Sequence, residues 1–393
     1  MILMVLEADN HATQRGRSGP PRAVWLGAAV GLSYTLKLHI NPSRTSFALN
    51  DLDADESLGR RNWWILVILD RWHAVSTSSP LLIPDSSVII MPEDQSLLGD
   101  SVFHLLRKFQ SLPIPSPTKL TFYSPGLSCI VGHLAELFVA PEDLMAPSSR
   151  SGPLISKLIA GEMERFRESV DAILGSLHVV HLAYWHIRLL LKRHTPGAEP
   201  IDLLGPAEII ARILNSSNAP FTPLTHHFAA LAALTLCEVA DVPDVRDVAR
   251  QGIKELQDAL DQRRATRAED GPTPAAATLP ATGWVATIRD LLANKTPQPQ
   301  QQPSSSSTTT GGNGTSSSVP NQGSLQHLAD LAVGGLDSEN AAPPASAQGV
   351  ATGSGTVDNA PDAASPRLDF TALTRVGYLA ALTGLGTGME NGR

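Results

Sequence analysis

Cysteine is scarce in this sequence: the 393 residues contain only Cys129 and Cys237. The two lie too far apart for a Cys-x-x-Cys metal knuckle, and two cysteines cannot build the disulfide framework of a small secreted protein. We therefore expect a reducing compartment, with no metal or cofactor bound by thiolates of this chain.

Charged residues are also few, and positive charge is the scarcer sign. Asp, Glu, Lys and Arg form 17% of the chain and the formal net charge is −8, whereas charged residues make up about 25% of an average soluble protein. Nucleic-acid phosphates are bound by clustered positive surfaces. We therefore do not expect this chain to hold DNA by itself, and we expect its two small arginine groups, at 15–22 and 263–267, to be solvated.

No hydrophobic run is long enough to cross a membrane. The longest, at 63–69, is far shorter than the roughly 20 residues that a spanning helix needs. The opening MILMVLEA has neither the basic leader nor the small-residue cleavage site of a signal peptide. We expect a protein that is neither secreted nor membrane-spanning. The opening also reads like the middle of a helix, which predicts that the chain begins inside a domain.

The compact motifs of common enzymes are missing from the sequence. It contains no G-x-x-x-x-G-K-[ST] phosphate loop, no G-x-G-x-x-G and no H-E-x-x-H. The nearest approach to a nucleophile elbow, GLSCI at 126–130, lacks the final glycine and lies in a helical context. We therefore expect no catalytic residues and no enzyme activity, with an unrelated helical enzyme as the less favoured alternative.

What the sequence does contain is a helical pattern. Apolar residues recur at three- and four-residue spacing through most of the first 293 positions, which is typical of helices packed on helices. Prolines fall mostly between the periodic segments, where a missing N–H does least harm. The sequence predicts an all-α domain over residues 1–293, with helices at 1–8, 23–38, 61–76, 97–110, 126–138, 154–193, 206–214, 224–240, 244–263 and 283–292.

The predicted helix at 154–193 is long, and Gly175 and Ser176 are its only soft point. Its first half is amphipathic, with acids and bases intermixed. Its second half, LHVVHLAYWHIRLLL, is apolar almost all round, so we expect it to be a central, buried helix.

The last hundred residues differ in composition from the rest of the chain. Residues 294–324, rich in Gln, Ser, Thr, Pro and Gly, cannot bury enough apolar surface to offset chain entropy and are predicted to be a flexible linker. Residues 325–393 are predicted to be a mostly disordered tail with two short apolar helices, at 325–336 and 368–385. Either helix could fold against a partner; we favour a weakly structured or docked-back tail.

Clustered histidines raise a metal hypothesis, because imidazole is a common metal ligand. No carboxylate or cysteine sits at ligand spacing beside them, and an apolar helix also accommodates histidines as hydrogen-bonded core residues. We favour the core interpretation for His178, His181, His186, His226 and His227.

The stretch GRRNWWILVILDRWHAVSTSSPLLIPD, at 59–85, places charges in a segment that otherwise suits a protein core. On a helix, Asp70 and Arg71 lie about 100° apart and Arg60 lies near the direction of Arg71. Stripped of water without partners, such charges cost several kcal/mol each. Either the charges reach solvent or each meets an opposite charge from another helix, and we favour a buried polar network that fixes how the helices dock. The tryptophans of the stretch are expected to be core anchors, with a small-molecule pocket as the alternative.

This stretch resembles the signature of the fungal-specific transcription factor domain, the helical middle region of fungal zinc-cluster regulators. In that family an R-R-x-x-W-W segment runs into an Asp-Arg pair and then a proline that usually follows Gly-Arg. Ser78-Ser79 replaces Gly-Arg here. The positions that match the signature are Arg60, Arg61, Trp63, Trp64, Asp70, Arg71 and Pro80.

Flanking segments extend the resemblance to about residues 23–240. AVWLGAAVGLSYTLKLHINPS resembles the preceding helix, which commonly ends in Gly-Leu-His; Lys37 replaces that glycine. LHVVHLAYWHIRLLLKRH resembles the later long helix of the family. TPLTHHFAALAALTL is similar to a helix in the branch of glucose-responsive regulators of sugar-transporter genes.

The resemblance implies a nuclear regulator of RNA polymerase II transcription. Full-length members carry a six-cysteine cluster that binds two zinc ions, a dimerising coiled coil, and then this helical domain as a regulatory module. Two cysteines cannot form that cluster, so the resemblance places zinc and DNA binding outside this chain. It implies coregulator proteins and a homodimer or a heterodimer with zinc-cluster factors as partners, and no membrane. The alternative is a DNA-free helical protein that modulates intact zinc-cluster factors.

Overall fold

The structure is a computed structural model of the chain. It describes residues 1–11, 21–40, 55–90, 94–106, 109–110, 123–124, 126–139, 151–195, 197–216, 222–269, 283–295 and 370–387.

Helices make up nearly all of the described residues in the first half of the chain. In chain order they are α1 (Ile2–His11), α2 (Arg22–Thr35), α3 (Asp55–Thr77), the short 3-10 helix η1 (Asp85–Ser87), α4 (Asp94–Leu106), which is kinked at Gly99, α5 (Leu127–Val139) and α7 (Ser151–Val170). Two two-residue strands, β1 (Phe109–Gln110) and β2 (Tyr123–Ser124), form an antiparallel pair.

The second half of the described chain is helical as well. It comprises α8 (His178–His194), α9 (Pro200–Asn215), α10 (Thr225–Val239), the 3-10 helix η2 (Pro243–Val245), α11 (Arg246–Glu269), α12 (Trp284–Ala293), α14 (Ala372–Val376) and α15 (Tyr378–Thr387). The prediction of an all-α fold is therefore confirmed.

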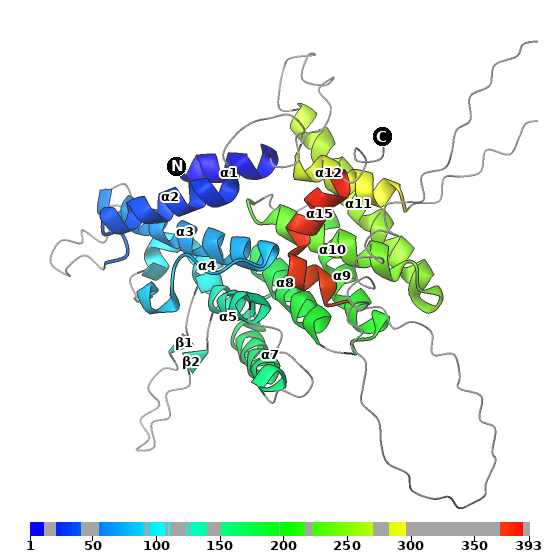
Figure 1. The fold of residues 1–393 in the computed structure, drawn as a ribbon, viewed down its shortest axis with the longest axis horizontal. Coiled ribbons are helices and arrows are strands. Elements are labelled where there is room, and N and C mark those ends of the chain that lie inside the picture. The colour runs from blue at the N-terminus through cyan, green and yellow to red at the C-terminus, as the bar shows by residue number, and fades with distance from the viewer. Residues whose placement is uncertain are drawn as a thin grey trace, which may run out of the picture.

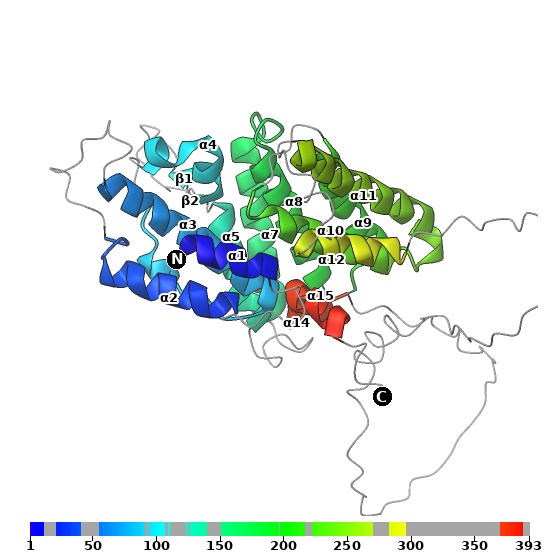
Figure 2. The ribbon, with the colours of Figure 1, turned by 90° about the horizontal axis from the view of Figure 1, so that it is seen from above.

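The helices form two neighbouring groups (Figures 1 and 2). In the first group α1 packs on α2, α2 on α3, and α3 on α5, which in turn contacts α7. In the second group α9 contacts α8, α10 and α11, and α12 lies against α10 and α11. Contacts of α8 with α4 and α5 join the two groups, so one hydrophobic core runs through both.

Two helices occupy the centre because their sequences are apolar on nearly every side. In α10, THHFAALAALTLCEV, almost every residue is buried. In α8 the buried side chains include Tyr184, His186 and Arg193. A helix that is hydrophobic all round cannot lie at a surface, which explains the central place that was predicted for the second half of 154–193.

Several helix boundaries differ from the predictions; α3, for example, begins at Asp55 and not at residue 61. The single helix predicted at 154–193 is wrong: α7 ends at Val170, and a turn that includes Gly175 and Ser176 leads into α8. The helix predicted to start at Pro206 begins at Pro200, where the Asp202 carboxylate accepts a hydrogen bond from the backbone N–H of Glu199 at 3.4 Å. The helix predicted to reach residue 110 ends at Leu106.

The C-terminal apolar segment is folded onto the helical core. Residues 370–387, which include α14 and α15 and which we call the strap, contact α3 and α10 (Figures 1 and 2). The buried strap side chains are Phe370, Leu373, Thr374, Tyr378, Leu379, Ala381 and Leu382. The predicted helix at 325–336, and the predicted linker apart from Asn294 and Lys295, lie outside the described residues.

Within the described ranges, no helix is both long enough and apolar enough to span a membrane.

Candidate regulatory site

The charged residues of α3 lie in the protein interior. Arg60, Asp70 and Arg71 are all at most 3% exposed. An unpaired charge at such depth costs several kcal/mol. The segment that follows α3 supplies the partners for all three residues.

Arg60 is bound by an aspartate at the start of the next helix. Its Nε and Nη2 donate to the two carboxylate oxygens of Asp94 at 2.8 and 2.9 Å, and Nη2 also donates to the Ile89 carbonyl at 2.7 Å. A two-point contact between a guanidinium and a carboxylate is strong and directional. Asp94 lies in the first turn of α4, where the helix dipole favours negative charge.

Asp70 is paired with backbone amides. The N–H of Leu82 donates to its Oδ1 at 3.0 Å and the N–H of Ile83 donates to its Oδ2 at 2.9 Å. Burial raises the pKa of Asp70 above its usual value, against the lowering effect of these two amides and of Arg71. The expectation of an opposite charge from another helix is therefore wrong for Asp70: its partners are neutral donors in a loop.

Arg71 starts a chain of contacts that reaches α7. Its Nη2 donates to Asp85 in η1. The other Asp85 oxygen lies 3.6 Å from Nε2 of His133 in α5, and Nδ1 of His133 lies 3.0 Å from a Glu162 carboxylate oxygen in α7. We call Arg60, Asp70, Arg71, Asp85, Asp94, His133 and Glu162 the signature network.

The carboxylates around His133 change its acidity. The hydrogen bond with Glu162 is the largest cause of a raised His133 pKa, and the charges of Asp85 and Glu136 act in the same direction, while partial burial opposes them. The imidazolium form is therefore favoured more in the folded protein than in the unfolded chain, and His133 joins α5 to carboxylates of both η1 and α7.

Other signature residues have different environments. Trp63 and Trp64 are fully buried: Trp63 packs edge-on against Tyr34 of α2, with ring centroids 5.5 Å apart, and the Arg60 guanidinium lies 4.6 Å from the Trp64 ring centroid. Arg61 is half-buried and Pro80 is exposed in the turn after α3. The structure thus brings Arg60 and Trp64 together and places Asp70 and Arg71 against the turn, whereas Pro80 contributes only to the turn itself.

Two departures from the family pattern lie at unusual backbone positions. Lys37 and Ser78, which replace the usual glycines, have φ values of +57° and +49° and are the non-glycine residues with positive φ in the described part of the chain. Each follows a helix end where the next residue bonds back across the turn: Leu38 N–H donates to Ser33 O and Ser79 N–H donates to Ala74 O, both at 3.0 Å. This C-terminal cap strongly favours glycine. The backbone therefore keeps a conformation suited to the family glycines although the side chains have changed.

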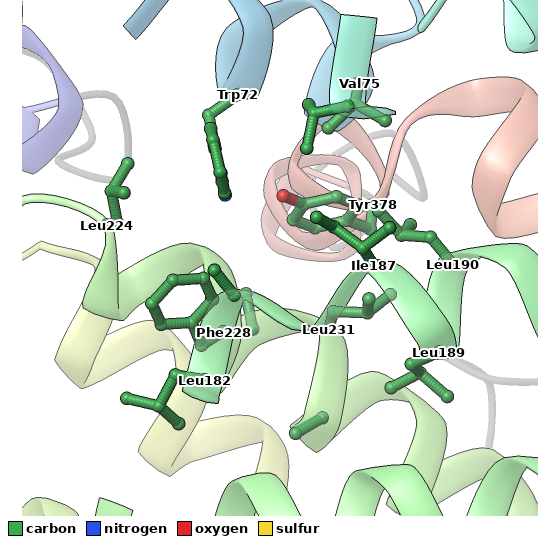
Figure 3. Close-up of a cluster of buried hydrophobic side chains, with 14 of the residues drawn as sticks. Trp72, Val75, Leu182, Ile187, Leu189, Leu190, Leu224, Phe228, Leu231 and Tyr378 are labelled. Carbon is green, nitrogen blue, oxygen red and sulfur yellow. The ribbon is translucent and has the colours of Figure 1, made fainter. Parts of the chain in front are cut away.

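A second cluster joins the strap to the end of α3 (Figure 3). The Tyr378 ring points into the space between Val75 of α3, Ile187 of α8 and the α10 side chains Phe228 and Leu231. Its hydroxyl lies 2.9 Å from Nδ1 of His227 and 3.3 Å from Nε2 of His186.

The clustered histidines divide into two groups. His186 and His227 are fully buried and His226 is half-buried; burial lowers the pKa of His186 and of His226 to about 3 and that of His227 well below its usual value. His178 and His181 are only half-buried. Among the described residues no group of three His, Cys, Asp or Glu side chains could hold a metal ion. The buried histidines His186 and His227 are thus neutral core groups.

The two cysteines are free thiols in the described core. Burial raises the pKa of Cys237 to about 12, so its reactive thiolate form is strongly disfavoured.

Several members of these clusters could not be identified from sequence patterns. Asp85, His133 and Glu162 lie on three separate elements, and only their packing brings them together. Asp94 did carry a signal, because an acidic residue just before a periodic apolar segment often begins a helix. Tyr378 belongs to the apolar segment predicted to be a helix at 368–385, and no sequence pattern indicates where that segment docks.

Comparison with known proteins agrees with the signature. Residues 6–151 match the family described as the fungal specific transcription factor domain. A Schizosaccharomyces pombe protein described as an uncharacterized transcriptional regulatory protein is 38% identical over 267 residues, covering 67% of this chain and 28% of that protein. Cutinase transcription factor 1 beta of Fusarium vanettenii is 33% identical over 81 residues, covering 21% of this chain and 8% of that protein. No solved structure matches.

The chain therefore spans a minor part of the length of these curated relatives. The family match covers α2, α3, α4 and α5, and it includes every member of the signature network except Glu162 of α7. Residues 6–151 of the chain thus match the fungal specific transcription factor domain, as the signature resemblance predicts.

Proposed function

We propose that this chain is the regulatory domain of a fungal RNA polymerase II transcription factor. The observation that carries the proposal is the core of the signature network: Arg60, Asp70 and Arg71 are buried and paired within the segment that matches the family. Two relatives named as transcriptional regulators support the same role.

The mechanism that we propose is conformational. A signal biases the packing of the helices around Arg60, Asp70 and Arg71 and so changes which surfaces the domain offers to coregulators or to the DNA-binding part of the factor. Buried ion pairs suit such a role, because they act over a narrow range of geometries and lose most of their energy when an element shifts.

We extend this proposal to the target genes, the cellular location and the DNA-binding part of the protein. The target genes are metabolic, with sugar-transport genes as the more specific candidates, and the protein acts in the nucleus without catalysing a reaction. Zinc and DNA are bound by a six-cysteine cluster outside this chain, which has two cysteines. Sequencing the transcript upstream of Met1 tests this point, because an in-frame cysteine cluster is expected there.

A second candidate is a DNA-free protein that modulates intact zinc-cluster factors through its helical surface. The cysteine count supports it, because two cysteines cannot build a six-cysteine zinc cluster. Co-purification of the tagged full chain with a defined zinc-cluster protein supports this candidate, and an upstream cysteine cluster in the same transcript counts against it.

The proposed function is tested by tethering the full chain to an unrelated DNA-binding domain upstream of a reporter gene in a fungal cell. We expect reporter output to differ several-fold from that of the DNA-binding domain alone, in one direction for an activator and in the other for a repressor. Equal outputs, with both proteins present at equal levels, would contradict a transcriptional role.

A further inference from the structure

The strap meets the end of α3 with its backbone. Gly377 has φ +87°, and a Cβ atom at this position would lie 2.6 Å from the Ser76 carbonyl oxygen and from Cα of Thr77. Contacts that short do not occur in real structures, so only glycine allows the strap to come this close. The point of contact is the last turn of α3, which we call the signature helix because it carries most of the family signature.

Specific contacts between the strap and the core lie on both sides of Gly377. Ser78 Oγ donates to the Thr374 carbonyl at 2.5 Å, and the Phe370 ring centroid lies 5.9 Å from the guanidinium carbon of Arg193. On the other side, the Tyr378 hydroxyl reaches both His186 and His227. The contacts are therefore specific, although few residues make them.

The strap is also poorly suited to hold its own structure. α14 has five residues and α15 has ten. Helices of this length are marginal in water when isolated, because helix nucleation is unfavourable. Docking must therefore supply the free energy that orders the strap, which lowers its net affinity for the core.

We propose that the strap is a proton-sensitive latch, which closes over His186 and His227 while both are neutral and leaves the end of the signature helix when they take up protons. The latch does not depend on the proposed transcriptional role, although it would give that role a regulator at the end of α3.

The contacts of Tyr378 determine whether docking of the strap strengthens or weakens as the pH falls. Tyr378 covers Nε2 of His186 and Nδ1 of His227, so release of the strap uncovers one nitrogen of each ring. Burial lowers the pKa of both histidines in the docked state. The docked state therefore binds fewer protons than the released state. Docking is strongest above pH 6.5 and weakens as the pH falls below it, by about tenfold per pH unit for each histidine that regains its ordinary pKa.

The charged and titratable groups that face His227 lower its pKa in the same direction as burial does. His227 lies near His226 of its own helix, Arg22 of α2, His73 of α3 and His186 of α8, and each of these lowers its pKa. The titratable group that the strap itself presents to both rings is the hydroxyl of Tyr378.

A third histidine is linked to the strap by charge. Burial and then Arg375 of the strap lower the pKa of His194 in α8 to about 4. Departure of Arg375 would raise that pKa, so His194 reinforces proton uptake on release.

Hydrogen exchange on the intact full chain tests the latch. We expect the exchange protection of α15 amides, corrected for intrinsic rates, to fall by about tenfold per uncovered histidine between pH 7.5 and pH 5.5. Protection of α8 and α10 should persist over the same range. Equal protection of α15 at the two pH values would overturn the proposal, and so would loss of α8 and α10 together with the strap, because that is global unfolding.

Variants separate the proton linkage from the packing. The pair His186→Gln and His227→Asn keeps a hydrogen-bonding group near each contact atom but cannot be protonated, so α15 should stay protected at pH 5.5. Gly377→Ala should remove α15 protection even at pH 7.5, whereas Tyr378→Phe should weaken protection at both pH values and leave its pH dependence unchanged. An unaltered pH dependence in the Gln/Asn variant would contradict the latch; if that variant does not fold, the wild-type comparison decides.

Discussion

Asp70 shows how a single buried carboxylate can be accommodated in a helical core. Its negative charge is opposed by burial, which raises its pKa, and is held by the backbone amides of Leu82 and Ile83. Removing the acceptor would leave donors without partners, which is more costly than the bond itself.

Truncation of Asp70 is therefore expected to be more damaging than neutralisation. Asp70→Ala should lower the free energy of unfolding by about 2–3 kcal/mol, and Asp70→Asn, which keeps one carbonyl acceptor, by about 1 kcal/mol. Denaturant unfolding of the full chain measures both values. Equal losses in the two variants would mean that the amide contacts contribute little.

Lys37 offers a test of the backbone argument. A left-handed conformation costs a non-glycine residue about 1–2 kcal/mol, and the Lys37 side chain is exposed. Lys37→Gly should raise the free energy of unfolding by about 1 kcal/mol. Lys37→Ala is the matched control, since it removes the same side chain but keeps a Cβ atom. If alanine stabilises as much as glycine, the effect comes from the lysine side chain and not from the backbone.

The sequence predicts that the buried charges have partners, but not which groups the partners are. Charges in the apolar stretch at 59–85 indicate partners, and the structure contains them. Whether each partner is an opposite charge or a backbone amide depends on how the loop at 82–85 returns along α3. No local sequence pattern encodes the path of that loop. The left-handed residues were visible only as departures from a family pattern, because Lys and Ser do not themselves signal positive φ.

At the scale of elements, α5 lies close to α3 because a glycine faces Arg71. A Cβ atom at Gly132 would lie 3.2 Å from Arg71 Nε, tighter than ordinary van der Waals contact. The Arg71 side chain is fully buried and cannot move into solvent. The spacing of these two helices thus depends on one missing methyl group.

Gly132→Ala and Gly161→Ala form a matched pair on α5 and α7. Both add the same methyl group within a helix, and the nearest atom to a Cβ at Gly161 is Arg165 Nη1 at 3.9 Å. Gly161→Ala should stabilise by about 0.5–1 kcal/mol through helix propensity. Gly132→Ala should lose that gain and destabilise by about 1–3 kcal/mol through overpacking. Thermal unfolding distinguishes the two, and equal shifts in Tm would contradict the close contact with Arg71.

His133 connects α5, η1 and α7 in a pH-dependent way. Because its pKa is raised in the folded state, its contribution to stability is fully present below about pH 6.5 and is lost as the pH rises through the folded pKa. An NMR titration should give His133 a pKa above 6.5 in the wild type. Glu162→Gln should lower that pKa, since it removes the largest cause of the shift; an unchanged value would exclude the contact.

Element boundaries were less predictable than element type. Periodicity identified the helical segments, but it could not show that the chain turns between α7 and α8, because Gly175 and Ser176 are tolerated within a helix as well as at its end. Pro206 looked like a start signal, yet it lies within α9 because the helix begins earlier, at Pro200.

At the scale of the whole molecule, the signature helix is in contact with the chain on either side of it and with the far C-terminus. Its charges bind the segment that follows it, and its last turn receives the strap. The composition of the tail predicted an apolar helix near residues 368–385, but the place where it docks depends on Gly377 and Tyr378 meeting surfaces from three other helices. Such long-range complementarity cannot be derived from periodicity.

The central claim is that the signature network regulates output and does more than hold the fold together. Reporter output per molecule of folded protein tests it most directly, with the full chain tethered to an unrelated DNA-binding domain. Asp70→Asn is compared with Ile210→Val, a change in the buried face of α9 that should cost a similar free energy, about 0.5–1.5 kcal/mol. We predict that Asp70→Asn changes the output at equal protein level whereas Ile210→Val leaves it at the wild-type value. The same output from both variants would contradict a regulatory role for the network.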